Sequence, residues 1–341
     1  MKNPSLGRDV LSWAAVALVA GCGGLQPPFG GPDATQGSSS ISTRSAYGGP
    51  GTGPPFLSQL RGGLSAPGAV QSLEYAGLRD VYVTEFLTNT VEMFKNEGYK
   101  PNGSITSGIN SPDGAFLDRD GNLYVANLGF TGPPGITEYA PRGSSPKFIY
   151  GANKIDPVTV SVDRYGHVYD ADYIGFVAEY GQGRNKILRS CSPGPRSSTE
   201  VRGVAVDQAG DVFITYDESP SGPGHIIKYT GGLSGCKGKV LGVTLDYAGG
   251  LTTDKNDKLI VCDMNKPAVD VIAPPYTHVT RTLGSGYSDP LNVTIDLGNT
   301  RVFVADAGNG VHVLDYASGA LIARLNGSQT DGAVDGPNAV Y

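Results

Sequence analysis

The sequence repeats one pattern of apolar strands and Asp-to-Gly turns along most of its length. The clearest copy has a short strand at 115–117, a turn from Asp118 to Gly121, a strand at 123–127 and another at 136–139. Aligned on the central apolar residue of the second strand, successive copies lie 42, 45, 44, 47 and 43 residues apart. The aligned residues are Tyr82, Tyr124, Tyr169, Phe213, Ile260 and Phe303. A repeat of about 44 residues matches a four-stranded propeller blade, so we predict an all-β, six-bladed β-propeller.

The composition of the strands predicts their places in each blade. The first strands are short and mix apolar with small residues, as a strand lining a narrow tunnel requires. The second strands are β-branched and aromatic throughout, so we expect them to be buried on both faces. The third strands alternate apolar and polar residues, which is typical of half-exposed strands. With 50 glycines and 24 prolines, the chain should contain many turns and little helix.

The two ends of the repeat region predict how the ring closes. The first copy begins at its second strand, near Asp80, and the chain stops at 337–341, which resembles a first strand with nothing after it. We therefore predict that the C-terminal strand completes the first blade. Such pairing leaves no open sheet edge.

The N-terminus has the features of a bacterial lipoprotein signal. The run Val10–Gly21 is uncharged and mostly apolar, too short to span a bilayer but suited to a signal-peptide core. It ends in Val-Ala-Gly before Cys22, which resembles a lipobox whose cysteine is diacylated. An ordinary signal peptide followed by a chance cysteine remains the alternative. Acyl chains on Cys22 would anchor the protein stably to a membrane.

The segment after Cys22 predicts a tether rather than a folded domain. Residues 23–77 are rich in Gly, Pro and Ser and have no periodic apolar pattern, so they cannot bury enough surface to fold. We divide the chain into a lipoprotein signal peptide (1–21), lipidated Cys22 with its linker (22–77) and the propeller (78–341). The expected location is the bacterial cell envelope outside the cytoplasm. Gly23 fits sorting to the outer membrane if the cell has one. The net charge of −6 argues against nucleic acid as a partner, and we expect a monomer.

The propeller region resembles NHL-repeat proteins. The segments Leu123–Asn127 and Val302–Asn309 match that repeat, in which a strand ends in Ala-Asp or Ala-Asn. Segments 247–251 and 268–276 are similar to a group of bacterial lipoproteins with this propeller and no assigned activity. The resemblance covers about residues 78–341. It implies the fold more than the function, because such propellers include binding scaffolds, lactonases and lyases.

Two columns of polar residues recur in the repeats. Each residue of the first column lies three positions before the Gly, Asp or Asn that ends a tight turn, which predicts that its side chain stabilises the turn. This column comprises Asp118, Asp163, Asp207, Asp254 and Asp296. The other closes each second strand, either as a cation- or sugar-binding rim or as a cap for the loop leading to the third strand. It comprises Glu85, Asn127, Asp172, Tyr216, Asp263 and Asp306.

A metal site is a further hypothesis from resemblance. In gluconolactonase-like propellers of the SMP-30 type, Asp and Asn in Pro-Asp-Gly and Pro-Asn-Gly contexts hold a divalent cation with a Glu. Asp113 matches this pattern, and Asn338 matches in part because Ala339 replaces the Gly. No residue matches the Glu. The resemblance would imply Ca, Mg or Zn at the tunnel mouth.

Three cysteines remain beyond Cys22. Cys262 lies in an apolar second strand and should be a buried thiol. One disulfide among three cysteines allows three pairings, and the sequence does not decide between them. Because Cys191 and Cys236 lie in loops or outer strands of adjacent blades of an exported protein, we take their pairing as the working expectation.

Together these features favour a membrane-tethered, extracytoplasmic binding or scaffold module for a protein or polysaccharide ligand. The main alternative is a metal-dependent lactonase or related hydrolase, and a purely structural envelope protein is a third.

Overall fold

The computed structural model describes residues 80–194, 199–219, 222–307 and 309–325, and the backbone of 337–340. In these ranges the chain is almost entirely β, with a single short 3-10 helix, η1 (Ser234–Cys236). Within them, no helix has both the length and the apolar character needed to cross a bilayer. The predicted signal peptide, Cys22 and the linker lie outside the described residues.

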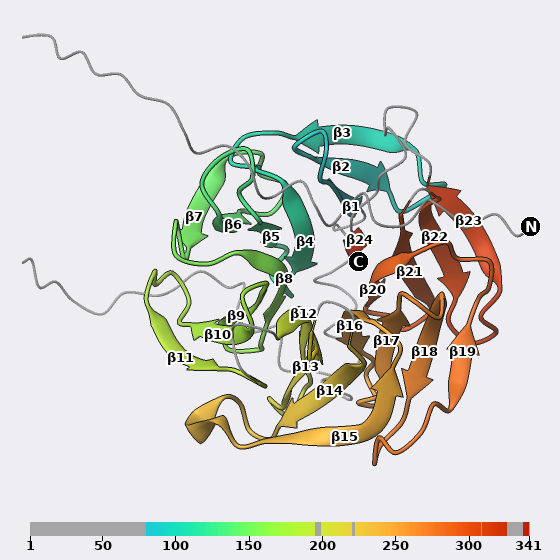
Figure 1. Cartoon of the computed structure of the whole chain (residues 1–341). Helices are drawn as coiled ribbons and strands as arrows, with labels where there is room; N and C mark the ends of the chain where they lie inside the picture. Colours follow the sequence, from blue (N-terminus) through green and yellow to red (C-terminus); the bar gives the residue numbers. More distant parts are fainter. Residues whose placement is uncertain (1–79, 195–198, 220–221, 308, 326–336, 341) are drawn as a thin grey trace, which may run out of the picture. The chain divides into compact units, whose positions relative to one another are not determined.

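Twenty-four strands form six four-stranded antiparallel sheets, arranged radially as the blades of a propeller (Figure 1). From the centre outward, blade 1 consists of β24 (Pro337–Val340), β1 (Asp80–Glu85), β2 (Thr90–Lys95) and β3 (Pro101–Ile105). Blade 2 consists of β4 (Pro112–Leu117), β5 (Leu123–Asn127), β6 (Gly135–Tyr139) and β7 (Pro146–Tyr150). Blade 3 consists of β8 (Pro157–Val162), β9 (Val168–Asp172), β10 (Phe176–Tyr180) and β11 (Ile187–Cys191). Blade 4 consists of β12 (Glu200–Val206), β13 (Val212–Asp217), β14 (Gly224–Tyr229) and β15 (Gly238–Leu245). Blade 5 consists of β16 (Ala248–Thr253), β17 (Leu259–Asp263), β18 (Ala268–Ile272) and β19 (Arg281–Leu283). Blade 6 consists of β20 (Pro290–Ile295), β21 (Arg301–Asp306), β22 (Gly310–Asp315) and β23 (Leu321–Leu325). The predicted fold and blade number are confirmed.

The hydrophobic core lies between neighbouring blades. Every residue of the second strands β5, β9, β13 and β17 is buried, as their composition predicted. Between blades 2 and 3, for example, the rings of Tyr124, Tyr150 and Tyr180 pack against one another. Each blade therefore needs its neighbours to bury its second strand, and stability belongs to the ring as a whole.

The C-terminal strand closes the ring as predicted. Strand β24 pairs antiparallel with β1, with Val340 opposite Val81 and Pro337 opposite Val83. It occupies the innermost position of blade 1, between β4 and β20 (Figure 1). The N- and C-terminal parts of the propeller therefore share one sheet.

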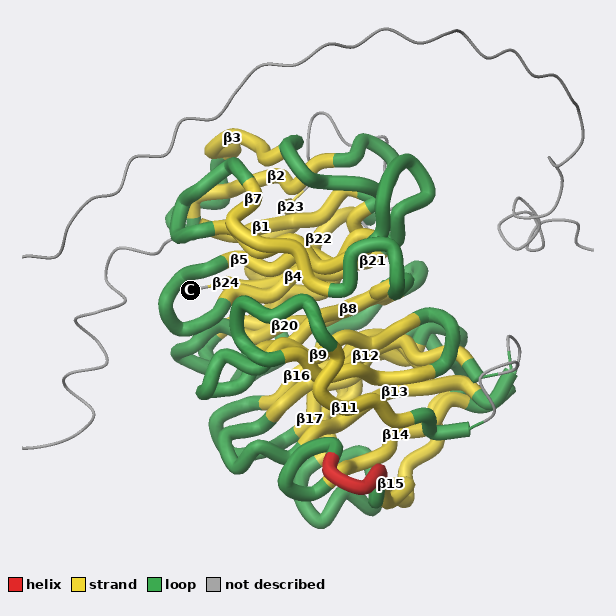
Figure 2. The backbone as a smooth tube through the Cα atoms, turned by 90° about the vertical axis from the view of Figure 1, so that its left-hand side faces the viewer, coloured by secondary structure: helices red, strands yellow, loops and turns green. Residues whose placement is uncertain are grey.

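The ring has two faces, which differ in their loops. We call the end at which the first strands begin the top face. It carries the loops from second to third strands and from each blade to the next. The bottom face carries the turns from first to second strands and the loops from third to fourth strands. Seen edge-on, loops project from both ends of the strands (Figure 2).

A disulfide crosses between blades 3 and 4. Cys191, the last residue of β11, is bonded to Cys236 in η1, with Sγ atoms 2.16 Å apart. Cys262 in β17 is buried and has a free thiol. The structure thus joins the two cysteines that the sequence suggested as partners.

Candidate functional site

The aspartates of the first column build the turns at the bottom face. Asp118 Oδ1, for example, accepts hydrogen bonds from the backbone N–H groups of Asp120 (2.9 Å) and Asn122 (2.8 Å), and Gly121 has a φ of 81°. Asp163, Asp207, Asp254 and Asp296 accept backbone N–H bonds in the equivalent turns. The structural role predicted for this column is confirmed.

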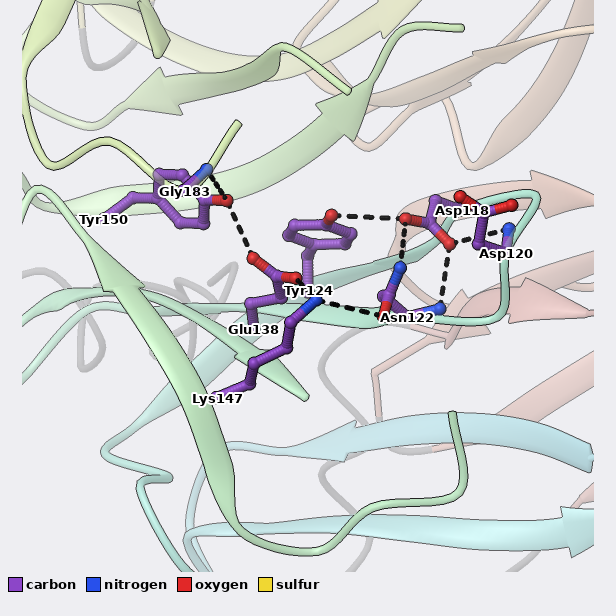
Figure 3. Close-up of polar contacts among 8 residues, drawn as sticks. All are labelled: Asp118, Asp120, Asn122, Tyr124, Glu138, Lys147, Tyr150 and Gly183. Carbon is purple, nitrogen blue, oxygen red and sulfur yellow. Dashed lines mark hydrogen bonds and ion pairs between the residues drawn. The ribbon is translucent and has the colours of Figure 1, made fainter. Parts of the chain in front are cut away.

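Figure 3 shows how one such turn connects to the interior of its blade. The second oxygen of Asp118 accepts from Asn122 Nδ2 (2.8 Å) and from the hydroxyl of Tyr124 (3.2 Å). Nearby, buried Glu138 pairs with Lys147 (2.6 Å) and accepts from the Tyr150 hydroxyl (2.7 Å). That hydroxyl accepts in turn from the backbone N–H of Gly183 in blade 3 (3.0 Å). Satisfied in this way, these buried polar groups hold adjacent blades together.

The bottom end of the tunnel opens into a cavity of about 530 Å³. Its walls are the first strands and Asp turns of blades 2 to 6, with Arg119, Tyr165, Gln208 and Lys255 among the lining residues. Most of the aspartate oxygens facing it are engaged in their own turns. The cavity is large, and acidic and basic side chains both line it.

The second column lies at the top face, where its side chains cap loops. Asn127 Oδ1 accepts from the backbone N–H of Asn110 (2.8 Å), and Asp306 accepts from those of Ser288 (2.9 Å) and Asp289 (2.7 Å). Asp172 and Asp263 bond the equivalent loops of their own blades. The capped loops lead mainly into the first strand, whereas we expected caps on the loop to the third. Bonds to that second loop also occur, as from Ile174 N–H to Asp172 (3.0 Å).

Blade 4 departs from this pattern. Tyr216 occupies the column's position, because it pairs with Val201 as Asp172 pairs with Pro157 and Asp306 with Pro290. Strand β13 then extends one residue further, to Asp217. Asp217 accepts a hydrogen bond from Ala248 N–H of blade 5 (2.9 Å) rather than from a loop of its own blade. Its other oxygen makes no hydrogen bond and lies 3.5 Å from Arg202 Nε.

Arg202 stands at the centre of a charged and aromatic cage at the top mouth of the tunnel. Its guanidinium carbon lies 5.4 Å from the ring centre of Tyr173 and 5.0 Å from that of Tyr247. Its Nη2 bonds to Glu200 and to the Tyr247 hydroxyl. Glu200 also accepts from the hydroxyls of Tyr173 (3.1 Å) and Tyr247 (3.3 Å). Blades 3, 4 and 5 each contribute to this cage, which combines stacking with charged hydrogen bonds.

The sequence analysis did not single out Arg202 and did not identify the cage. A signal was present, because the corresponding place in β16 is taken by Gly249 and that in β20 by Leu291. An arginine at this place is therefore an exception among these first strands.

Burial dominates the electrostatics of the cage. It raises the pKa of Asp217 to about 6, against the opposing effects of the Ala248 N–H and the Arg202 charge. It also raises the pKa of the Tyr247 hydroxyl to about 12. The Asp217 carboxyl therefore titrates close to neutral pH.

This shift predicts a pH-dependent contribution to stability. Because the folded pKa of Asp217 lies above its ordinary value of 3.8, folding favours the protonated form. The stabilisation is fully present below that ordinary value and is lost as the pH rises through about 6. Urea unfolding should therefore show that Asp217→Asn removes about 2 kcal/mol of the change in unfolding free energy between about pH 4.5 and about pH 7.5. Parallel profiles for the variant and the wild type would contradict the shift.

The structure places Asp113 near the start of β4, partly exposed and next to the closing strand. The side chain of Asn338 lies outside the described residues, so the proposed Asp113–Asn338 metal pair stays a prediction. Among the side chains that are described, no three His, Cys, Asp or Glu residues gather closely enough to hold a metal ion.

Comparisons with known proteins support the fold alone. No family model and no curated protein matches the sequence. Many solved structures resemble it, among them one titled "Crystal structure of Nidogen/Laminin Complex", with a TM-score of 0.61 and 16% sequence identity. That match covers 77% of this chain and 98% of the other. At such identity the likeness shows a propeller, and the NHL-like and SMP-30-like assignments remain hypotheses.

Proposed function

We propose that this protein is a binding module whose working surface is the top mouth of the propeller tunnel. The observation that supports this is the Arg202 cage. A guanidinium, two tyrosine rings and two carboxylates from three blades converge there, and the corresponding places in β16 and β20 carry no arginine. Functional residues on rigid scaffolds typically lie on such loops.

Site-specific photocrosslinking in cells tests this assignment. Ile174 is 46% exposed on the loop that carries Tyr173, and Leu188 is 44% exposed on the outer strand β11, so the two positions are a matched pair. A photoreactive residue at Ile174 should give a discrete adduct, and one at Leu188 should not. Equal labelling at both positions, or none at Ile174 in well-expressed protein, would exclude the top mouth as the working surface.

We also propose that the module is held at the cell envelope by lipidated Cys22, with residues 23–77 as a tether. Cys22→Ala is expected to move the protein from the membrane fraction to the soluble fraction, because the acyl chains provide the anchoring energy. Fractionation with immunoblotting measures the shift. Retention of the variant in the membrane fraction would show that another segment or a partner holds it there.

The lactonase alternative depends on a divalent ion touching Asp113. Metal analysis of mildly purified full-length protein, followed by lactone hydrolysis with and without a chelator, separates it from a binding module.

A further inference from the structure

Acidic side chains are arranged around the top mouth in two concentric rings. In each of blades 2 to 6, one acidic residue lies within two residues of the start of the first strand. This inner set, which we call the mouth ring, comprises Asp113, Asp156, Glu200, Asp246 and Asp289. The second set, the capping ring, closes the second strands. It comprises Glu85, Asp172, Asp217, Asp263 and Asp306, with Asn127 in blade 2.

Few basic residues balance these charges. In the described loops and strand ends of the top face, the basic side chains are Lys154, Arg202 and Lys266, with Arg324 at the rim on the outermost strand β23. The bottom face is mixed, since its first-to-second-strand turns carry Arg119, Arg164 and Lys255 as well as acids. A cleft lined by one sign of charge concentrates ligands of the opposite sign. The top mouth is thus the end of the tunnel that attracts cations.

The Arg202 cage shows that carboxylates and tyrosine rings at this mouth hold a cationic side chain. Asp217 is fully buried, and its Oδ2 has no hydrogen-bond partner although it faces the guanidinium. Two tyrosine rings and two carboxylates around one guanidinium form a surrounding that suits arginine and lysine side chains. The protein already holds one such group at the mouth, and Tyr173 at its edge is 42% exposed.

The loops of blades 1 to 3 add apolar contacts beside the mouth. Leu87, Phe130 and Ile174 are 61%, 72% and 46% exposed on the loops from second to third strands. Phe130 also packs edge-on against Phe86 of the neighbouring blade, with ring centres 5.8 Å apart. Exposed apolar side chains next to a charged cleft are typical of protein interaction sites.

We propose that the top face binds a lysine- or arginine-rich segment of a partner protein that also carries apolar side chains. This inference rests on the proposed function of the top mouth. The acidic groups are spread over all six blades, and the described ones form no group able to hold a single metal ion, so the arrangement suits a ligand with several separated charges. A neutral polysaccharide would gain nothing from charges of one sign.

The test uses full-length protein in mild detergent and a fluorescent peptide of lysine and leucine, with a glutamate-and-leucine peptide as the comparison. Asp156 and Asp246 lie in the mouth ring, and their described side chains make no hydrogen bond or ion pair, so Asp156→Asn with Asp246→Asn should fold normally. Asp120→Asn with Asp257→Asn changes the net charge equally at the bottom face and is the matched control.

Fluorescence anisotropy should show that the lysine peptide binds and the glutamate peptide does not. The mouth-ring double variant should bind about tenfold more weakly, with a shallower salt dependence, while the bottom-face variant stays within about twofold. Equal weakening in both variants would overturn the proposal, because it would reflect net charge alone. If Ile174 crosslinks in cells but the lysine peptide does not bind, the partner chemistry is wrong and the top-face function stands. If Ile174 does not crosslink and the lysine peptide does not bind, both the top-face function and the partner chemistry are wrong.

Discussion

Removing residues 337–341 is expected to destabilise the whole propeller by more than about 5 kcal/mol, which approaches the total stability of a typical domain. The deletion takes away β24, the innermost strand of blade 1, and leaves β1 as an open edge facing the tunnel. The deletion also removes the contacts of β24 with β4 and β20, so blade 1 packs less well against blades 2 and 6. The ring is then no longer closed, and second strands at these interfaces become less buried.

Thermal and urea unfolding of the full and truncated chains measures this effect. Leu321→Ser provides a control, because Leu321 is 51% exposed on the outermost strand β23 and its replacement should cost less than about 0.5 kcal/mol. Equal melting temperatures for the truncated and full chains would refute the closing role of β24.

Replacing Arg202 by methionine is expected to lower the unfolding free energy by about 3–5 kcal/mol near neutral pH. Methionine fills much of the same space between the Tyr173 and Tyr247 rings but leaves the buried Asp217 carboxylate without its opposite charge. The loss should shrink at low pH, where Asp217 is protonated. Urea unfolding at several pH values tests both the size and the pH dependence.

A double-mutant cycle supplies the control for this prediction. Adding Asp217→Asn to Arg202→Met removes the unpaired charge, so the double variant should recover part of the stability that the single variant loses. The stability of Arg202→Lys should lie between those of the wild type and Arg202→Met. Lysine keeps the positive charge but lacks the planar guanidinium that stacks on the tyrosine rings. A loss below about 1 kcal/mol in Arg202→Met would refute the stabilising role of the cage.

The elements that depend on neighbouring residues could be predicted from the sequence. The strand at Leu123–Asn127 follows from its β-branched and aromatic residues, and the turn at Asp118 from an aspartate three residues before a glycine. Repetition of these local signals at nearly constant spacing fixes the number of blades. The unpaired first strand at the C-terminus then leaves one way for the ring to close.

The site could not be predicted in the same way. Strand β13 continues one residue past Tyr216, and the extra residue, Asp217, is the carboxylate that faces Arg202, which spacing alone did not reveal. The mouth ring is equally hidden, because Asp113 follows its proline whereas Asp156 and Asp289 precede theirs.

What the sequence determined by itself was the repeating strand, the turn and the count of blades, since each is decided by contacts within about 45 residues. What only the tertiary structure decided was the meeting of Tyr173, Arg202 and Tyr247, which belong to three different blades. Their approach depends on how the sheets are angled around the tunnel. That angle is a property of the packed ring, and no local periodicity encodes it.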